Sequence, residues 1–103
     1  MKDPLIHDLY IGFIRIHILY HASRDRVYGL ALMTELARHG YQVGPGTLYP
    51  MLHALEEKGL LESEKKVVNG KRRRYYRITA YGAKALETAR AHTAELISEI
   101  NEE

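Results

Sequence analysis

The sequence predicts a mainly α-helical domain with one small antiparallel β-hairpin. Proline and glycine signals divide the first half of the chain into three helices, an Asn-Gly pair separates two strand-like segments, and a long helical pattern closes the chain. Because 103 residues suffice for one compact domain but not for two, we expect a single domain over residues 1–103. Within it we expect three helices and the hairpin over about 5–79, and a C-terminal dimerisation helix over about 80–101.

The composition narrows the class of protein. Hydrophobic residues make up 46% and charged residues 27% of the chain, which is typical of a globular domain. The chain has no cysteine, so disulfides, thiolate catalysis and cysteine-bound zinc are excluded. It lacks the run of roughly 18 apolar residues that a membrane helix needs. Asp3 and Pro4 stand where the apolar stretch of a signal peptide would begin. We therefore expect a cytoplasmic protein.

The first helix is expected to begin at Pro4, with Asp3 as its N-cap. The apolar residues that follow are too dense for one stripe, and a helix that is apolar on most sides must be buried on most sides. In so small a domain, this pattern indicates a partner chain. On this helix we expect a dimer interface that includes Leu9, Phe13, Ile16 and Tyr20.

Two further helices are expected before the hairpin. One covers Tyr28–Arg38, because apolar residues recur at helical spacing and Gly40 follows its end. The next is expected to begin at Pro45, after Gly44 as N-cap, and to run to about residue 58. A helical wheel gives this helix a core stripe at Leu48, Met51, Leu52 and Leu55. The outward face then holds Gly46, Pro50, His53, Ala54 and Glu57, with Thr47 and Tyr49 on its flanks.

The hairpin is predicted by Asn69-Gly70, which separates strand-like segments at 60–68 and 71–79. A two-residue loop would place Leu61 opposite Ile78, so that both can face the core. The same register sets cations opposite one another further along the strands, with Lys65 facing Arg74 and Lys66 facing Arg73.

The last helix is expected after Thr79, which can cap its first turn. A near-heptad stripe runs along it through Leu86, Ala89, Thr93, Leu96 and Ile100. Packing within its own domain is the more frequent use of such a stripe, whereas a heptad seam would make this a dimerisation helix. We expect the second role, with Leu86, Leu96 and Ile100 in the dimer interface.

Positive charge is concentrated on the hairpin, where seven of the 15 lysines and arginines lie between residues 65 and 77. This pattern suggests contact with a polyanion, although a hairpin kept soluble by its charge is the plainer alternative. The facing like charges favour a polyanion, because they repel one another unless an anion lies between them. On the hairpin we expect DNA contacts from Lys65, Lys66, Lys71, Arg72, Arg73 and Arg74.

Three helices followed by a hairpin is the order of a winged helix-turn-helix, in which the third helix enters the major groove of DNA and the hairpin is the wing. We therefore expect a homodimeric, sequence-specific regulator of transcription whose partner is double-stranded DNA. Base contacts are expected from the outward face of the third helix, and phosphate contacts from the hairpin. The alternative is a winged-helix module that binds protein, because a fold does not dictate its partner.

The sequence also resembles the PadR family of bacterial and archaeal regulators over about residues 13–90. The segments that carry the resemblance are Tyr28-Gly29, Gly46–Leu52, Leu55-Glu56, Lys58–Leu61, Arg74–Thr79 and Gly82. The resemblance implies a winged helix with dimerising terminal helices, in a family that consists mostly of repressors. It also implies DNA contacts from the wing and from Thr47, Tyr49 and Pro50, with Tyr28 near a phosphate. The chain departs from the family in its Gly44-Pro45 cap and in its single, short C-terminal helix.

Six histidines suggest a metal hypothesis. His17 and His21 are four residues apart on the first helix, a spacing that can chelate an ion. No acidic or His-rich signature completes a ligand set, and interface or surface histidines are the plainer alternative.

The eight tyrosines could line a ligand cavity. More commonly, tyrosines fill a core in which each hydroxyl has a hydrogen-bond partner. We expect no cofactor. Whether the protein binds an effector, either a small molecule or a metal ion, stays open.

No catalytic constellation accompanies these features. The sequence has no thiol, no glycine-rich phosphate loop, no nucleophile elbow and no dense carboxylate cluster. We therefore expect a protein that is not an enzyme.

Overall fold

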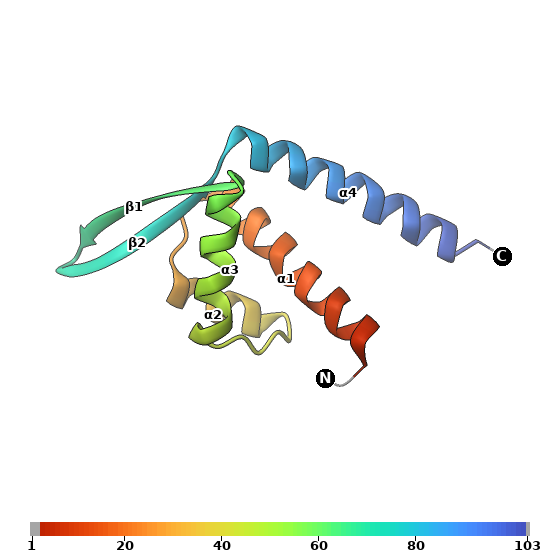
Figure 1. The fold of residues 1–103 in the computed structure, drawn as a ribbon, viewed down its shortest axis with the longest axis horizontal. Coiled ribbons are helices and arrows are strands. Elements are labelled where there is room, and N and C mark those ends of the chain that lie inside the picture. The colour runs from red at the N-terminus through yellow and green to blue at the C-terminus, as the bar shows by residue number, and fades with distance from the viewer. Residues whose placement is uncertain (1–2, 103) are drawn as a thin grey trace.

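The computed structural model describes residues 3–102, whose elements follow the predicted order (Figure 1). The four helices are α1 (Pro4–Arg24), α2 (Gly29–Arg38), α3 (Pro45–Glu57) and α4 (Ala80–Ile100). The two strands are β1 (Leu61–Val68) and β2 (Lys71–Ile78). Residues 1–2 and 103, which the single-domain prediction included, lie outside the described residues.

The helix starts follow the predicted cap chemistry. The Asp3 carboxylate accepts hydrogen bonds from the backbone N–H groups of Leu5 and Ile6, at 2.9 and 3.2 Å. The Thr79 hydroxyl accepts one from the backbone N–H of Gly82, at 2.9 Å. Each bond satisfies a donor that the first turn of a helix would otherwise leave without a partner.

The hydrophobic core lies where α1, α2 and α3 pack together against the base of the hairpin. All four residues of the predicted stripe on α3 are buried, which confirms the helical wheel. Burying an aliphatic side chain contributes about 1.5–3 kcal/mol. The side chains with almost no exposed surface are Ile14, Ile18, Leu32, Leu36, Leu48, Leu52 and Leu61.

The predicted hairpin register is confirmed at all eight pairs, including the pair of Leu61 with Ile78. Asn69 and Gly70 have φ angles of 52° and 76°, as the two central residues of a type I′ turn require. Each strand is one residue shorter than predicted at the base of the hairpin, where the chain leaves α3 and enters α4. We call residues 61–78 the wing.

One backbone pairing was not predicted from the sequence. Val27, between α1 and α2, exchanges two backbone hydrogen bonds with Tyr76 of β2, at 2.8 and 2.7 Å. This bridge fastens the α1–α2 connection to the wing. A strand one residue long has no periodicity, so no sequence pattern could indicate it.

These elements form the predicted winged helix-turn-helix. Figure 1 shows the wing projecting from one side of the helical core, while the free ends of α1 and α4 lie on the opposite side. Gly82 is the buried residue of α4, and most of that helix extends away from the core as an arm. Among the described residues, no helix combines the length and the hydropathy needed to span a bilayer.

Candidate functional site

Of the seven residues that the wheel assigned to the outward face of α3 and its flanks, Ala54 is half-buried and six are exposed, which are Gly46, Thr47, Tyr49, Pro50, His53 and Glu57. The N-cap of α3 is Gly44, which has no side chain to accept a hydrogen bond from the first turn. Pro45 has no N–H and those of Thr47 and Leu48 donate to the Gly44 carbonyl, at 3.2 and 3.0 Å, so the N–H of Gly46 is left without a partner among the described residues. This donor and the positive end of the helix dipole favour an anionic oxygen. The small residues at this end also let another molecule approach the backbone closely.

Tyr49 lies across the start of α2. A Cβ atom at Gly29 would lie 2.5 Å from the Tyr49 hydroxyl oxygen, so the lack of a side chain at Gly29 makes room for the ring. Gly29 is buried, whereas Tyr49 keeps 44% of its surface exposed. The tyrosine is therefore held at the boundary of α2 and α3 with part of its ring open to solvent.

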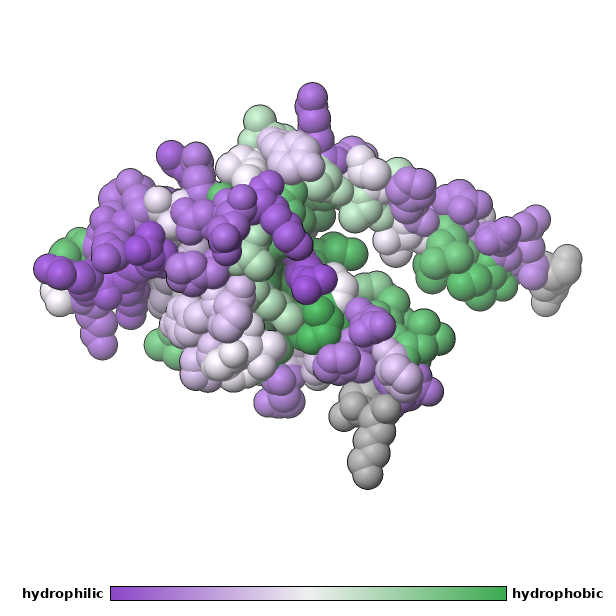
Figure 2. Space-filling view, viewed as in Figure 1, coloured by the Kyte–Doolittle hydropathy of each residue, from purple (hydrophilic) through white to green (hydrophobic). Residues whose placement is uncertain are grey.

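Some of the charges of the wing are paired within it. The Nε atom of Arg77 lies 2.9 Å from an oxygen of Glu62, and Nζ of Lys66 lies 3.8 Å from an oxygen of Glu64. Among residues 3–102, three exposed wing cations make no ion pair or side-chain hydrogen bond, namely Lys65, Lys71 and Arg72. Two of the three, Lys71 and Arg72, lie next to the turn, so the tip of the wing carries uncompensated positive charge. Figure 2 shows hydrophilic side chains over the wing.

Besides Lys66, two of the predicted wing cations have partners within the protein. The guanidinium carbon of Arg73 lies 4.1 Å from the centre of the Tyr28 ring, and Tyr28 is the N-cap of α2. Arg74 donates a hydrogen bond of 3.0 Å to the Ser63 hydroxyl, which donates to the Glu56 carboxylate of α3 at 2.8 Å. These contacts fasten the wing to α2 and α3. Ser63 and Glu56 were not predicted from the sequence, because their meeting depends on two elements that pack only in the fold.

Tyr76 lies beneath this network and is 2% exposed. Burial raises the pKa of its hydroxyl, Arg74 opposes this rise, and Glu56 and Tyr49 add to it. The phenol therefore stays uncharged at neutral pH. It also marks the place where α3, the wing and the α1–α2 connection meet.

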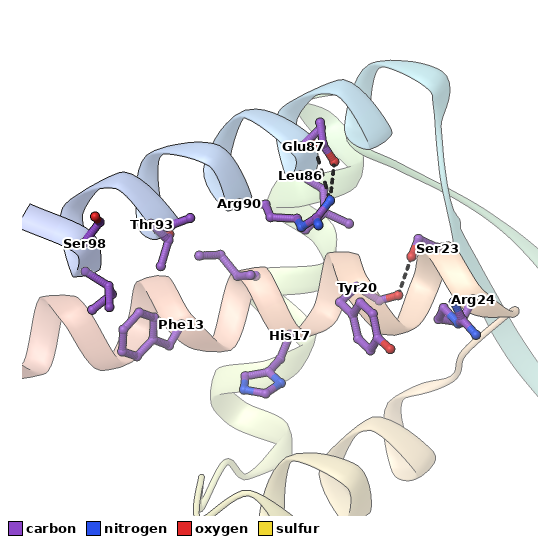
Figure 3. A pocket seen from close by; sticks show the side chains of 13 residues that line it. Phe13, His17, Tyr20, Ser23, Arg24, Leu86, Glu87, Arg90, Thr93 and Ser98 are labelled. Carbon is purple, nitrogen blue, oxygen red and sulfur yellow. Dashed lines mark hydrogen bonds and ion pairs between the residues drawn. The ribbon is translucent and has the colours of Figure 1, made fainter.

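A second surface lies between α1 and α4, where an open groove has a volume of about 970 Å³ (Figure 3). Four of the seven residues predicted for a dimer interface line this groove, namely Phe13, Ile16, Tyr20 and Leu86. The other three lie outside the groove and are about half exposed or more: Leu9 at 48%, Leu96 at 50% and Ile100 at 65%. Within one chain, the stripe of α4 is half-buried at Leu86 and Ala89 and exposed at Thr93, Leu96 and Ile100.

The predicted metal candidates, His17 and His21, lie at the junction of α1 with the end of α2. A third imidazole, which the sequence did not indicate, is that of His39, and it stacks on His17 with ring centres 5.0 Å apart. His39 follows α2 in the chain, so no local spacing could connect it with the pair on α1.

Comparison with known proteins gives a consistent assignment. A family model described as the transcriptional regulator PadR-like family matches residues 18–88. A transcriptional regulator of Mycobacterium tuberculosis is 53% identical over 87 residues, which cover 84% of this chain and 81% of that protein.

Solved structures agree with the family match. A PadR family transcriptional regulator from Eggerthella lenta is 34% identical, with a TM-score of 0.81 over 93% of this chain and 85% of its own. A PadR-like transcriptional regulator from Bacillus cereus is 32% identical, with a TM-score of 0.84 over 91% of this chain and 93% of its own. In both cases the likeness extends over more than nine-tenths of this chain.

Proposed function

Because this chain belongs to the PadR-like family of transcriptional regulators, we propose that it binds double-stranded operator DNA as a homodimer and represses transcription there. The observation that carries the proposal is the exposed start of α3, without a side-chain cap, on the same domain as a wing with uncompensated cations at its tip. DNA offers base edges to the first surface and phosphates to the second.

In this proposal α3 reads the sequence of the DNA. The exposed side chains of Thr47, Tyr49 and His53 offer hydroxyl and imidazole groups to base edges in the major groove. Pro50 and the methyl group of Thr47 offer apolar contact to thymine methyl groups. Gly46 lets the backbone approach the DNA, and its own N–H can donate to a phosphate.

The wing contributes affinity that depends little on sequence. Lys65, Lys71 and Arg72 are exposed without an internal partner among the described residues, so their charge is available to phosphates of any sequence. Lys66 and the two arginines with internal partners, Arg73 and Arg74, stand beside them on the same strands. The contacts of Arg73 with Tyr28 and of Arg74 with Ser63 help to set the direction of the wing, so we assign these arginines phosphate contact together with a positioning role. Lys66, which pairs with Glu64 of its own strand, is assigned phosphate contact alone.

A second copy of the chain is the proposed occupant of the groove between α1 and α4. Large apolar side chains that solvent would otherwise surround lie on both helices, as Leu9 and Leu96 illustrate. The free ends of the two helices lie opposite the wing (Figure 1), so a dimer formed there leaves both α3 helices and both wings available. Two reading helices would then enter successive major grooves about 34 Å apart.

Repression is the mode that the resemblance to the PadR family implies, and occupancy of a promoter by such a dimer would exclude other proteins from it. The test of DNA binding is the affinity of the full chain for a labelled random-sequence duplex at several salt concentrations. The logarithm of affinity should fall linearly with the logarithm of salt, with a slope of about −0.9 for each phosphate contact. Absence of binding at low salt would contradict the proposal and favour a protein-binding module.

A further inference from the structure

Three imidazoles meet where α1 contacts the end of α2. His17 and His21 lie one turn apart on α1, and His39 is the C-cap residue of α2. Each offers one ring nitrogen, and the three atoms lie within 4.8 Å of one another. Figure 3 shows the ring of His17 pointing from α1 away from α4, and this ring lies 5.0 Å from that of His39, centre to centre. The cluster is therefore a product of the fold and is separate from the wing and from α3.

One atom of this cluster has no partner. The Nε2 atom of His21 is buried, and no atom of residues 3–102 forms a hydrogen bond with it. A buried polar atom that lacks a partner typically costs about 1–3 kcal/mol, so such an atom calls for an explanation. A metal ion explains it, because an imidazole nitrogen that carries a lone pair is a metal ligand.

The surroundings of the cluster also favour binding of a cation, because they keep His17 neutral and place the carboxylate of Glu35 nearby. Burial lowers the pKa of His17, as do the neighbouring rings of His39 and His21, whereas Glu35 raises it. Neutral imidazole is the form that binds metals. The carboxylate of Glu35 lies 3.7 Å from Nε2 of His39, and Arg38 holds it in place with bonds of 3.0 and 3.2 Å.

We propose that His17, His21 and His39 bind one divalent transition-metal ion of the zinc type and so clamp α1 to the end of α2. Three nitrogen ligands favour zinc, cobalt, nickel or copper over calcium or magnesium, which prefer oxygen. A tetrahedral zinc ion with bonds of about 2.0–2.1 Å sets its ligand atoms roughly 3.3 Å apart. Rotation of the side chains would close the remaining gap, and Glu35 or water would take the fourth position.

This inference goes beyond the proposed function, because it concerns a site that touches no DNA. The bound ion would join α1 to α2 on one side of α1, whereas the groove lies on the side that faces α4. Residues 40–44 connect His39 to α3, so a bound ion would also fix one end of the connection that leads to the reading helix. Only the binding of metal and the stability of the fold are needed to test it.

The test is calorimetric titration of Zn²⁺ into the full chain after removal of metal with a chelator, in the absence of DNA. The variants are H39Q and H17Q, with H92Q as the control, because His92 is exposed on α4 and lies outside the cluster. We expect one ion per chain, an affinity about tenfold or more lower in H39Q and H17Q, and no change in H92Q. Circular dichroism establishes that each variant is folded.

A second readout is the melting temperature, which an ion bound only to the native state must raise. Saturating Zn²⁺ should raise the melting temperature of the wild type and of H92Q, and should raise that of H39Q much less. No binding by the wild type would overturn the proposal, as would equal affinities for the wild type, H39Q and H17Q. Since no DNA takes part, these outcomes leave the proposed function to its own test.

Discussion

The guanidinium of Arg73 stacks on the ring of Tyr28, with its central carbon 4.1 Å from the ring centre. The contact joins the wing to the first turn of α2. A cation over an aromatic face contributes about 0.5–2 kcal/mol, depending on exposure. Here it holds a flexible cation of the wing on a rigid helix start, so it reduces the number of directions that the wing can adopt.

This stacking predicts different effects for two substitutions at Tyr28. Y28F keeps the ring and should retain most of the DNA affinity, whereas Y28A should weaken binding by roughly 0.5–2 kcal/mol more, because Arg73 loses its support. Fluorescence anisotropy with operator and random duplexes measures both affinities. Equal losses for Y28F and Y28A would assign the effect to the hydroxyl, and would contradict the positioning role.

The tip of the wing should determine the salt dependence of binding. Arg72→Ala removes an exposed cation that has no internal partner among the described residues, so operator and random DNA should bind more weakly by similar factors. The slope of log affinity against log salt should become shallower by about 0.9, because one phosphate is no longer neutralised. Lys84→Ala, which removes an exposed cation of α4, is the control and should leave the slope unchanged. A slope that Arg72→Ala does not alter would contradict the role given to the wing.

Substitution on α3 should act on the operator alone. Thr47→Ala removes a hydroxyl and a methyl group from the exposed start of α3, and should weaken operator binding by roughly 1–3 kcal/mol for each base that Thr47 reads. Random DNA should bind nearly as before, because its affinity comes from phosphates. A uniform decrease on both kinds of DNA would mean that Thr47 contacts the backbone and does not read bases.

Gly29→Ala offers a way to move Tyr49 without removing it. The new Cβ would meet the far end of the tyrosine, at 2.5 Å from its hydroxyl oxygen, so the flexible ring should swing aside and the fold should survive. We expect unchanged secondary structure and an operator affinity lower by about 1–3 kcal/mol. Gly12→Ala is the control, because a Cβ there meets nothing within 4 Å. An unchanged operator affinity would show that the position of Tyr49 is not important for recognition.

The dimer interface can be tested at the exposed end of α4. Leu96→Asp places a charge where we propose that a second chain packs, and an unpaired charge in an apolar interface is costly. Leu96 is 50% exposed in the single chain, so the variant should stay folded and sediment as a monomer, while the wild type sediments as a dimer. Lys84→Asp is the control, because Lys84 is exposed and does not line the groove. A wild type that is monomeric at micromolar concentration would refute this interface.

Much of the fold could be predicted because its signals are local. The cap at Asp3, the turn at Asn69-Gly70 and the stripe on α3 each depend on a few neighbouring residues, and each is confirmed. The bridge between Val27 and Tyr76 could not be predicted, because it joins segments that only the packed core brings together.

The candidate site divides in the same way. The exposed face of α3 and the cations of the wing could be predicted from spacing and charge. The internal partners of Arg73 and Arg74 could not, because Tyr28 and Ser63 reach them from other elements. His39 was missed for the same reason, since it joins the pair on α1 only through the packing of α2.

The most direct test of operator recognition by a dimer is selection of bound duplexes from a random pool by the full chain. If two copies present α3 to successive major grooves, the selected sequences should share a two-fold symmetric consensus with half-sites about 10 base pairs apart. Thr47→Ala should blur that consensus, and Arg72→Ala should leave it intact. A pool that shows no enrichment after repeated rounds, or a consensus without symmetry, would contradict recognition by a symmetric dimer.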